Sequence, residues 1–160
     1  MNAPLTSIPD PTDASSAGSS DLDPRAMHWA YISLAPFVLG ALLAMIVRDH
    51  ALPFVLHMLA GYGAAVIAFL GGVHWTFAMQ GRQPVGASTL RHAMIPVVLA
   101  WLAVVMPPHA GLVVQGVAMI GGYLVDRKVY PRQGLSPWLV IRFRASMGAA
   151  LCCFLAAAQT

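Results

Sequence analysis

The chain has 160 residues, a net charge of +3 and a mean hydropathy of +0.70, with 58% hydrophobic and only 9% charged residues. Soluble domains carry about 25% charged residues. This chain therefore lacks the polar side chains that a soluble enzyme or a nucleic-acid-binding protein needs at its surface. Its length fits four or five membrane-spanning helices of about 20 residues each.

Residues 1–24 are rich in Pro, Ser, Asp and Ala and show no apolar periodicity, which predicts a disordered tail. The segment is not a signal peptide, because no basic region is followed at once by an apolar core. It also differs from a mitochondrial presequence, which would be rich in Arg and poor in acidic residues. This pattern favours a bacterial inner-membrane protein.

Residues 25–160 contain five apolar stretches that predict a five-helix transmembrane bundle. The expected spans are about 27–47, 52–79, 90–106, 109–125 and 138–158. Helices are expected because lipid offers no hydrogen-bond partner to an open backbone and the runs are continuously apolar. The third and fourth stretches are short, and Pro107-Pro108 joins them. We expect a hairpin of two full spans there, with a re-entrant pair as the alternative. Pro36 and Pro96 should kink their helices.

Basic residues concentrate on one side of this predicted bundle. With five spans, the N-terminus and the loops at 80–90 and 126–137 share a side. Eight basic residues lie on or near it: Arg25, Arg82, Arg91, Arg127, Lys128, Arg132, Arg142 and Arg144. The other side holds Arg48. Since cytoplasmic loops carry an excess of Lys and Arg, we expect a cytoplasmic N-terminus and a periplasmic C-terminus.

Small residues recur at helical spacing in two of the predicted spans. They are Gly61, Ala64, Ala68 and Gly72 in the second span, and Ala145 and Ala149 in the fifth. Such stripes let helix backbones approach closely in lipid. Packing within the bundle is the favoured reading, and a face for a partner subunit is the alternative.

Ionisable side chains inside the spans are candidate functional residues, because their burial in lipid is costly. His74 lies in the second span, Asp126 closes the fourth, and Arg142 and Arg144 begin the fifth, all at similar depth. We expect a polar pocket open to the cytoplasm in which Asp126 pairs with one of these arginines. Arg142 is favoured because it shares the small-residue face of its helix. The alternatives are snorkelling arginines, a histidine bonded to a neighbouring helix, and an aspartate paired with basic loop residues.

The histidines raise the question of a cofactor. His74 and His92 fall at similar depth on adjacent spans, as bis-histidine ligation of haem b requires, so haem is an alternative. The chain has no metal-ligand spacing such as HExxH and no nucleotide-binding or Ser-His-Asp motif. We therefore expect no metal, no resident cofactor and no catalytic residue.

The segment GGVHWTFAM, residues 71–79, resembles the GGVHWGLAM segment of a bacterial integral-membrane family of unknown function. That family is similar to the mitochondrial transmembrane protein 69 group. Asp126, Pro137-Trp138 and Ile141-Arg142 follow its further pattern, with Ile141 in place of Leu and Thr76 in place of a common Gly. The resemblance covers about residues 28–158. It implies the fold, the number of spans and the site positions, including His74 and Trp75, and it implies no activity.

These observations favour a small, non-catalytic accessory or assembly subunit of a bacterial inner-membrane complex, with a respiratory complex as one possibility. Its partners would be the bilayer and a larger integral-membrane protein, with no nucleic acid. The alternative is a ligand-binding or small transport protein that uses the polar pocket for a quinone, haem or an anionic lipid. A carrier of protons or ions is less expected, because no carboxylate falls at the middle of a span.

Overall fold

The computed structural model describes residues 24–47, 49–79 and 87–159, and these residues form helices joined by short turns, with no strand among them. The elements are α1 (Pro24–Ile32), α2 (Ala35–Ile46), η2 (Asp49–Ala51), α3 (Leu52–Met79), α4 (Ala87–Val105), α5 (Pro108–Val129), η3 (Tyr130–Gln133) and α6 (Trp138–Ala157). The fold class is all-α, as predicted. The tail predicted to be disordered, residues 1–24, lies outside the described residues except for Pro24, which begins α1.

The number of helices long enough to cross a membrane differs from the five predicted. Four described stretches are long and apolar enough: Met27–Ile46, Leu52–Thr76, Pro108–Arg132 and Trp138–Ala157. Within α4 (Ala87–Val105), the stretch Arg91–Val105 is a shorter apolar helix, below the length of the other four. The fourth predicted span was expected to be short, but α5 continues through Arg127 and Lys128 to Val129.

The first predicted span is two helices rather than one kinked helix. Pro36 has no N–H to bond to the preceding turn, and α1 ends before it at Ile32. The hydroxyl of Ser33 bonds the carbonyl of Ala30 at 2.7 Å. The amide N–H of Phe37 donates to the carbonyl of Leu34. In a continuous α-helix it would donate to the carbonyl of Ser33, so that carbonyl lacks its usual helical partner. The hydroxyl of Tyr62 on α3 donates to that carbonyl at 2.7 Å, so a side chain from another helix stabilises the break.

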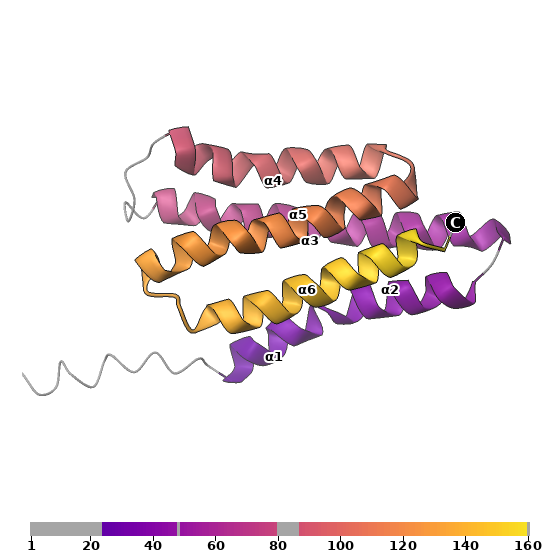
Figure 1. Cartoon of the computed structure of the whole chain (residues 1–160), viewed down its shortest axis with the longest axis horizontal. Helices are drawn as coiled ribbons and strands as arrows, with labels where there is room; N and C mark the ends of the chain where they lie inside the picture. The colour runs from indigo at the N-terminus through magenta and orange to yellow at the C-terminus, as the bar shows by residue number, and fades with distance from the viewer. Residues whose placement is uncertain (1–23, 48, 80–86, 160) are drawn as a thin grey trace, which may run out of the picture.

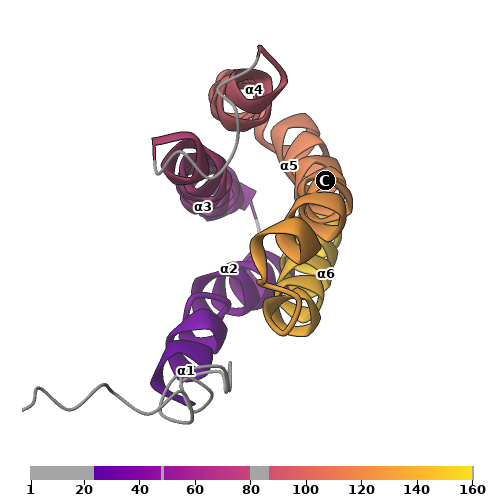
Figure 2. The ribbon, with the colours of Figure 1, turned by 90° about the vertical axis from the view of Figure 1, so that its left-hand side faces the viewer.

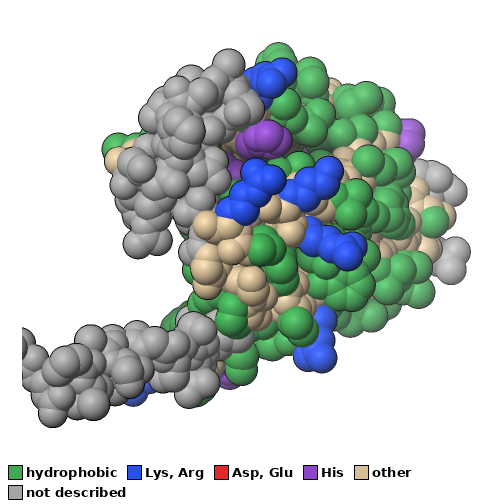
Figure 3. Space-filling view, turned by 60° about the vertical axis from the view of Figure 1, so that its left-hand side comes forward, with side chains coloured by type: hydrophobic (Ala, Val, Ile, Leu, Met, Phe, Trp, Pro, Cys, Tyr) green, Lys and Arg blue, Asp and Glu red, His purple; other side chains and the backbone are tan. Residues whose placement is uncertain are grey.

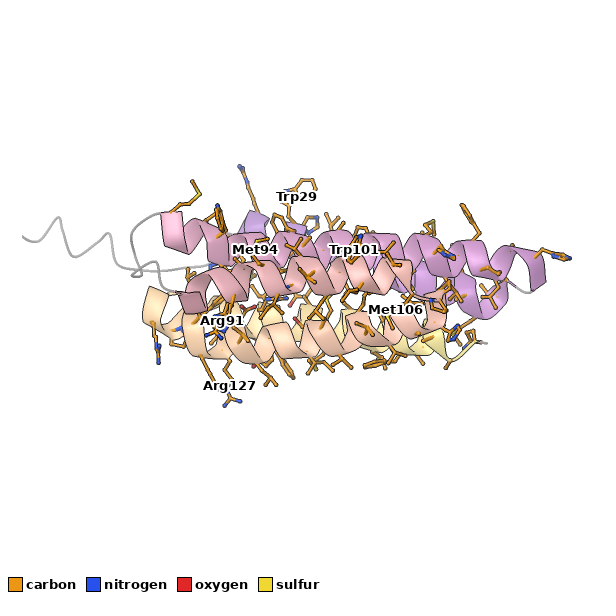
Figure 4. The ribbon with its side chains drawn as sticks, turned by 90° about the horizontal axis from the view of Figure 1, so that it is seen from above. Trp29, Arg91, Met94, Trp101, Met106 and Arg127 are labelled. Atoms are coloured by element: carbon orange, nitrogen blue, oxygen red, sulfur yellow. The ribbon has the colours of Figure 1, made fainter. Side chains whose placement is uncertain are left out.

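The helices run along one common direction and alternate in sense (Figure 1). One end of the bundle holds the starts of α1, α4 and α6 and the ends of α3 and α5. We call it the basic end, because Arg91, Arg127, Lys128, Arg132 and Arg144 lie there and are exposed. Figure 4 shows Arg91 and Arg127 at this end and Met106 at the other, beside the α4–α5 turn.

Two turns set the register of the last three helices. Pro107 is extended, with ψ near 139°, as a residue before proline prefers, and Pro108 begins α5 in the first turn, where its missing N–H costs nothing. At the basic end, Gly134 adopts a left-handed conformation with φ 72°, which closes η3 and turns the chain into α6.

Viewed end-on, the helices form an arc of α4, α5, α6 and α2, with α3 inside it (Figure 2). α3 packs extensively on α4, α5 and α2, whereas its contact with α6 is slight. The buried apolar core lies in the half away from the basic end. It comprises Phe37, Ala44, Val55, Leu56, Leu59, Ala60, Ile67, Ala100, Leu112, Met119, Ala149, Ala150, Cys153 and Ala156.

Candidate functional site

Three helices bring one ionisable residue each to a common point near the basic end. His74 lies near the end of α3, Asp126 near the end of α5 and Arg142 in the first turns of α6. Arg142 Nε donates to Asp126 Oδ2 at 2.6 Å, and His74 Nε2 lies 3.1 Å from Asp126 Oδ1. Asp126 is 1% exposed and His74 is 8% exposed. We call these three residues the polar cluster.

The guanidinium of Arg142 ties the cluster to its own helix and to the turn before it. Its Nη1 donates to the hydroxyl of Ser146, one turn further along α6, at 2.8 Å, and Ser146 is itself buried. Tyr130, buried at the end of α5, also contacts Arg142 and lies near Asp126. The carboxylate thus has a cationic partner, without which its burial would be prohibitively costly.

Both ring nitrogens of His74 face oxygen atoms. Nδ1 lies 3.3 Å from the carbonyl oxygen of Leu70, one turn back along α3, while Nε2 faces Asp126. The Nε2–Oδ1 contact has the distance of an ion pair without the alignment of a hydrogen bond. The rings of His74 and His92, the pair considered for haem, have centroids 6.3 Å apart. Among the described residues, no group of three His, Cys, Asp or Glu side chains could hold a metal.

A cavity of about 560 Å³ adjoins the polar cluster between α3, α4 and α5. We call it the α4–α5 cavity. His74, His92, Asp126 and Arg142 supply its polar wall. The rest of the lining is apolar or glycine: Ile67, Leu70, Gly71, Ile95, Pro96, Leu99, Val113, Val114, Val117, Ala118, Met119, Gly121, Gly122 and Val125.

A second cavity of about 560 Å³ lies on the other side of the cluster, between α1, α2, α3 and α6. It exists because α3 and α6 hardly touch. Arg142, Leu70 and Met119 line both cavities and therefore stand between them. The remaining wall of this second cavity includes Tyr62 and Trp138 and is largely apolar.

Lys and Arg side chains gather around histidine at the basic end, and the surface is otherwise mainly hydrophobic (Figure 3). Of the two arginines offered as partners for Asp126, the structure pairs Arg142 and leaves Arg144 exposed. Arg144 Nη1 instead lies 3.4 Å from the hydroxyl of Tyr31 on α1. Trp75 is 44% exposed and lines neither cavity.

The two small-residue stripes lie in different environments. On α6, Ala149 is buried in the core and Ala145 is half-buried beside the second cavity, so this stripe serves packing within the bundle. On α3, Gly61 and Gly72 are exposed, and a Cβ added to either would meet no atom within 4 Å. Ala64 and Ala68, between them, are half-buried.

Sequence reasoning missed polar residues whose partners are distant in the chain. Gln115 is fully buried on α5 and donates through Nε2 to the carbonyl of Ala60 on α3 at 2.7 Å. Gly63 leaves room for this amide, because a Cβ there would collide with Oε1. A lone glutamine inside an apolar span was the available signal. Ser146, four residues after Arg142, was another.

Comparisons with known proteins assign the chain to a family. A family model described as "Protein of unknown function (DUF3429)" matches residues 22–158, so the chain belongs to this family. Transmembrane protein 69 of Xenopus tropicalis is 33% identical over 105 residues, which are 62% of this chain and 41% of that protein. Transmembrane protein 69 of Mus musculus is 32% identical over 81 residues, 49% of this chain and 33% of that protein.

The chain thus aligns with less than half the length of these relatives. No solved structure matches it. The family and the relatives establish a membrane protein similar to transmembrane protein 69, in agreement with the resemblance carried by the GGVHW segment.

Proposed function

We propose that this member of the DUF3429 family is a non-catalytic membrane protein that binds an amphipathic small molecule in the α4–α5 cavity. The observation that carries the proposal is the cavity itself. It combines a long apolar wall with one polar end formed by His74, His92, Asp126 and Arg142. Ligand sites are typically apolar concavities of about 300–1,000 Å³ with a few convergent polar groups.

The cavity opens sideways toward the lipid. α4 and α5 lie together at their turn and diverge toward the basic end (Figure 1). Ile95, Val113 and Val117 line the cavity and are exposed, so the cavity wall is continuous with the apolar surface of the bundle. A hydrophobic molecule dissolved in the bilayer could enter between the two helices without passing through water.

The polar cluster supports a binding role because a purely structural bundle gains little from it. A buried ion pair is often replaceable by apolar side chains with no loss of stability. Ionisable residues within membrane helices are functional candidates by default. Here the cluster adjoins empty volume on one side, in addition to its contacts with the buried Ser146 and Tyr130. Such an arrangement fits a group that orients the head of a ligand.

The test compares three proteins purified in mild detergent: the unaltered chain, Gly122→Leu and Gly61→Leu. Gly122 lines the cavity. A Cβ added there would lie 3.6 Å from Arg142 Nη2, an ordinary contact distance, so α5 can carry a side chain at this position that fills the cavity. Gly61 is an open position outside both cavities and is the matched control. Mass spectrometry of extracted small molecules should find one stoichiometric amphiphile with the unaltered chain and Gly61→Leu, and none with Gly122→Leu. The same molecule on all three would contradict the proposal.

We propose a second function on a separate observation, the outward glycine face of α3. Gly61 and Gly72 remain open in the bundle. Small residues at such positions allow another membrane helix to approach closely. They fit an accessory or assembly subunit that docks on a larger integral-membrane protein, with a respiratory complex as the candidate to examine first.

The docking proposal predicts a different result for substitutions on α3 and in the cavity. Gly61→Leu and Ala68→Leu should release the co-purifying protein, whereas Gly122→Leu should retain it. Ala149→Leu is unsuitable as a test, because Ala149 lies in the core and its enlargement would disturb folding. If Gly61→Leu still co-purified with the partner, the α3 glycine face would not be the docking surface.

We propose that the protein lies in the bacterial inner membrane with its basic end toward the cytoplasm. The support is the clustering of exposed Lys and Arg at one end of the bundle, as the positive-inside rule describes. Reporter fusions would then be active in the periplasm at residue 160 and inactive there at residue 1. The reverse pattern would overturn the orientation.

A further inference from the structure

The charges of Asp126 and Arg142 in the polar cluster balance each other before any ligand binds. Asp126 directs Oδ2 to Arg142 and Oδ1 to His74, so both carboxylate oxygens are engaged. One carboxylate and one guanidinium cancel. An anionic ligand head placed in this low-dielectric site would find no net positive charge from this pair and would lose its hydration.

The groups that remain available to a ligand are hydrogen-bond donors. Arg142 uses Nε for Asp126 and Nη1 for Ser146, and it also contacts Tyr130, while Nη2 lies toward Gly122 on the cavity wall. The guanidinium carries five N–H donors, more than these contacts use. The His92 ring forms part of the same wall and is exposed. A guanidinium donates only, and a neutral imidazole can donate from one nitrogen. A ligand that accepts hydrogen bonds is therefore complementary to this end of the cavity.

We infer that the ligand is a neutral amphiphile with a carbonyl-bearing ring and an apolar tail, the chemistry of a quinone. This inference rests on the proposed binding function and names its ligand class. One carbonyl accepts from Arg142 Nη2 and His92, the ring lies near the His92 imidazole, and the tail leaves between α4 and α5 along Ile95 and Val117.

A phospholipid fits this site less well. The exposed cations that would neutralise a phosphate, Arg91, Arg127 and Lys128, do not line the cavity and lie nearer the end of the bundle. A phosphate bound to them would leave the polar end of the cavity unused. Phosphatidylglycerol binding is accordingly an outcome that the experiment must distinguish.

The test uses the full chain in phosphatidylcholine nanodiscs, with decylubiquinone as the probe. Decylbenzene has a ring and a tail but no carbonyl and is the ligand control. Binding is followed by native mass spectrometry and by the rise in Tm. We expect one decylubiquinone per chain and weaker binding of decylbenzene. His92→Phe keeps a ring but loses the nitrogens and should weaken decylubiquinone binding about tenfold, the equivalent of one hydrogen bond. Gly122→Leu should abolish binding, and Val140→Leu, at an exposed position of α6 outside both cavities, should leave it unchanged.

The outcomes separate the inference from the proposed function. Equal binding of decylubiquinone and decylbenzene, or an unchanged affinity in His92→Phe, would overturn the assignment of a carbonyl ligand. Phosphatidylglycerol retention that is lost in Gly122→Leu, without decylubiquinone binding, would overturn the ligand class while leaving the binding function in place. If Gly122→Leu still bound decylubiquinone, the binding site would lie outside the cavity, and both the ligand inference and the proposed binding function would be overturned.

Discussion

The half of the bundle near the α4–α5 turn and the half near the basic end use glycine differently. In the first half, glycines bring helices into contact: a Cβ on Gly40 would lie 2.8 Å from Leu59, one on Gly116 would lie 2.6 Å from the ring of Phe154, and one on Gly111 would strike the carbonyl oxygen of Ala103. In the second half, Gly121 has no neighbour within 4 Å of such a Cβ and lines the α4–α5 cavity together with Gly122.

The half with closed glycines contributes mainly to stability, whereas the basic half holds the proposed binding residues. Tight interhelical packing holds helices together in lipid, where the hydrophobic effect contributes little to their association. Most of the apolar core lies in the half with the closed glycines, whereas the polar cluster lies in the other half. Both cavities extend from the cluster toward the core, because Met119 of the core lines both of them. Gly61 and Gly71 are the exceptions on α3, because Gly61 is open in the first half and Gly71 is closed in the second. Gly71 packs against α4 at Ala93 and Pro96 and anchors the cavity wall.

The largest expected effect comes from breaking the ion pair that supports the open half. Asp126→Asn leaves Arg142 buried without its anionic partner, and loss of one partner of a buried pair costs about 3–5 kcal/mol. Unfolding of the detergent-solubilised protein by a harsher detergent measures this difference. The double variant Asp126→Leu with Arg142→Met should recover most of the stability yet bind no ligand. A double variant as unstable as the single one would show that the cluster is needed for folding.

A matched pair of alanine substitutions tests the contrast between the halves directly. Gly111→Ala should lower the free energy of unfolding by about 1–3 kcal/mol, because α4 and α5 must separate at Ala103. Gly121→Ala should instead be neutral or stabilising by up to about 1 kcal/mol, since alanine favours the helix and meets open space. Thermal unfolding of both variants in the same detergent measures the difference. Equal effects at both positions would contradict the distinction between closed and open glycines.

A smaller effect is expected at the middle of the bundle, where the halves meet. Gln115→Leu removes the bond to the Ala60 carbonyl. Polar contacts between membrane helices average about 0.6 kcal/mol, so the loss of stability should be of that size. Hydrogen exchange at α3 residues near Gly63 provides the measurement. A loss of more than about 2 kcal/mol would mean that this amide, rather than the glycine packing, holds α3 to α5.

The sequence was sufficient for the features that depend on composition and local order. Continuous apolar runs predicted the helices, and similar depth along their spans predicted that His74, Asp126 and Arg142 would approach one another. The break between α1 and α2 was less accessible, because it depends on Tyr62 reaching Ser33 from another helix. A polar pocket was predicted, but its long apolar wall and the second cavity were not, since they arise from the divergence of α4 and α5 and from the separation of α3 and α6.

The same limit explains the two small-residue stripes. Gly61 and Ala149 look alike in sequence, as small residues repeated at helical spacing. The structure buries Ala149 in the core and leaves Gly61 open. Spacing along one helix shows which residues share a face, but the identity of the helix opposite that face depends on the whole bundle.

The most direct test of the account is photo-crosslinking from the cavity wall in intact membranes. A photoreactive phenylalanine analogue at Val117 would project from the lateral opening of the α4–α5 cavity, and one at Val140, exposed on α6 outside the cavities, would be the control. We expect the crosslinker at Val117 to capture one small amphiphile, identified by its added mass, and we expect Gly122→Leu to remove this product. Val140 should capture only bulk lipid. The same lipid mixture at both positions, unchanged by Gly122→Leu, would contradict a ligand-binding cavity.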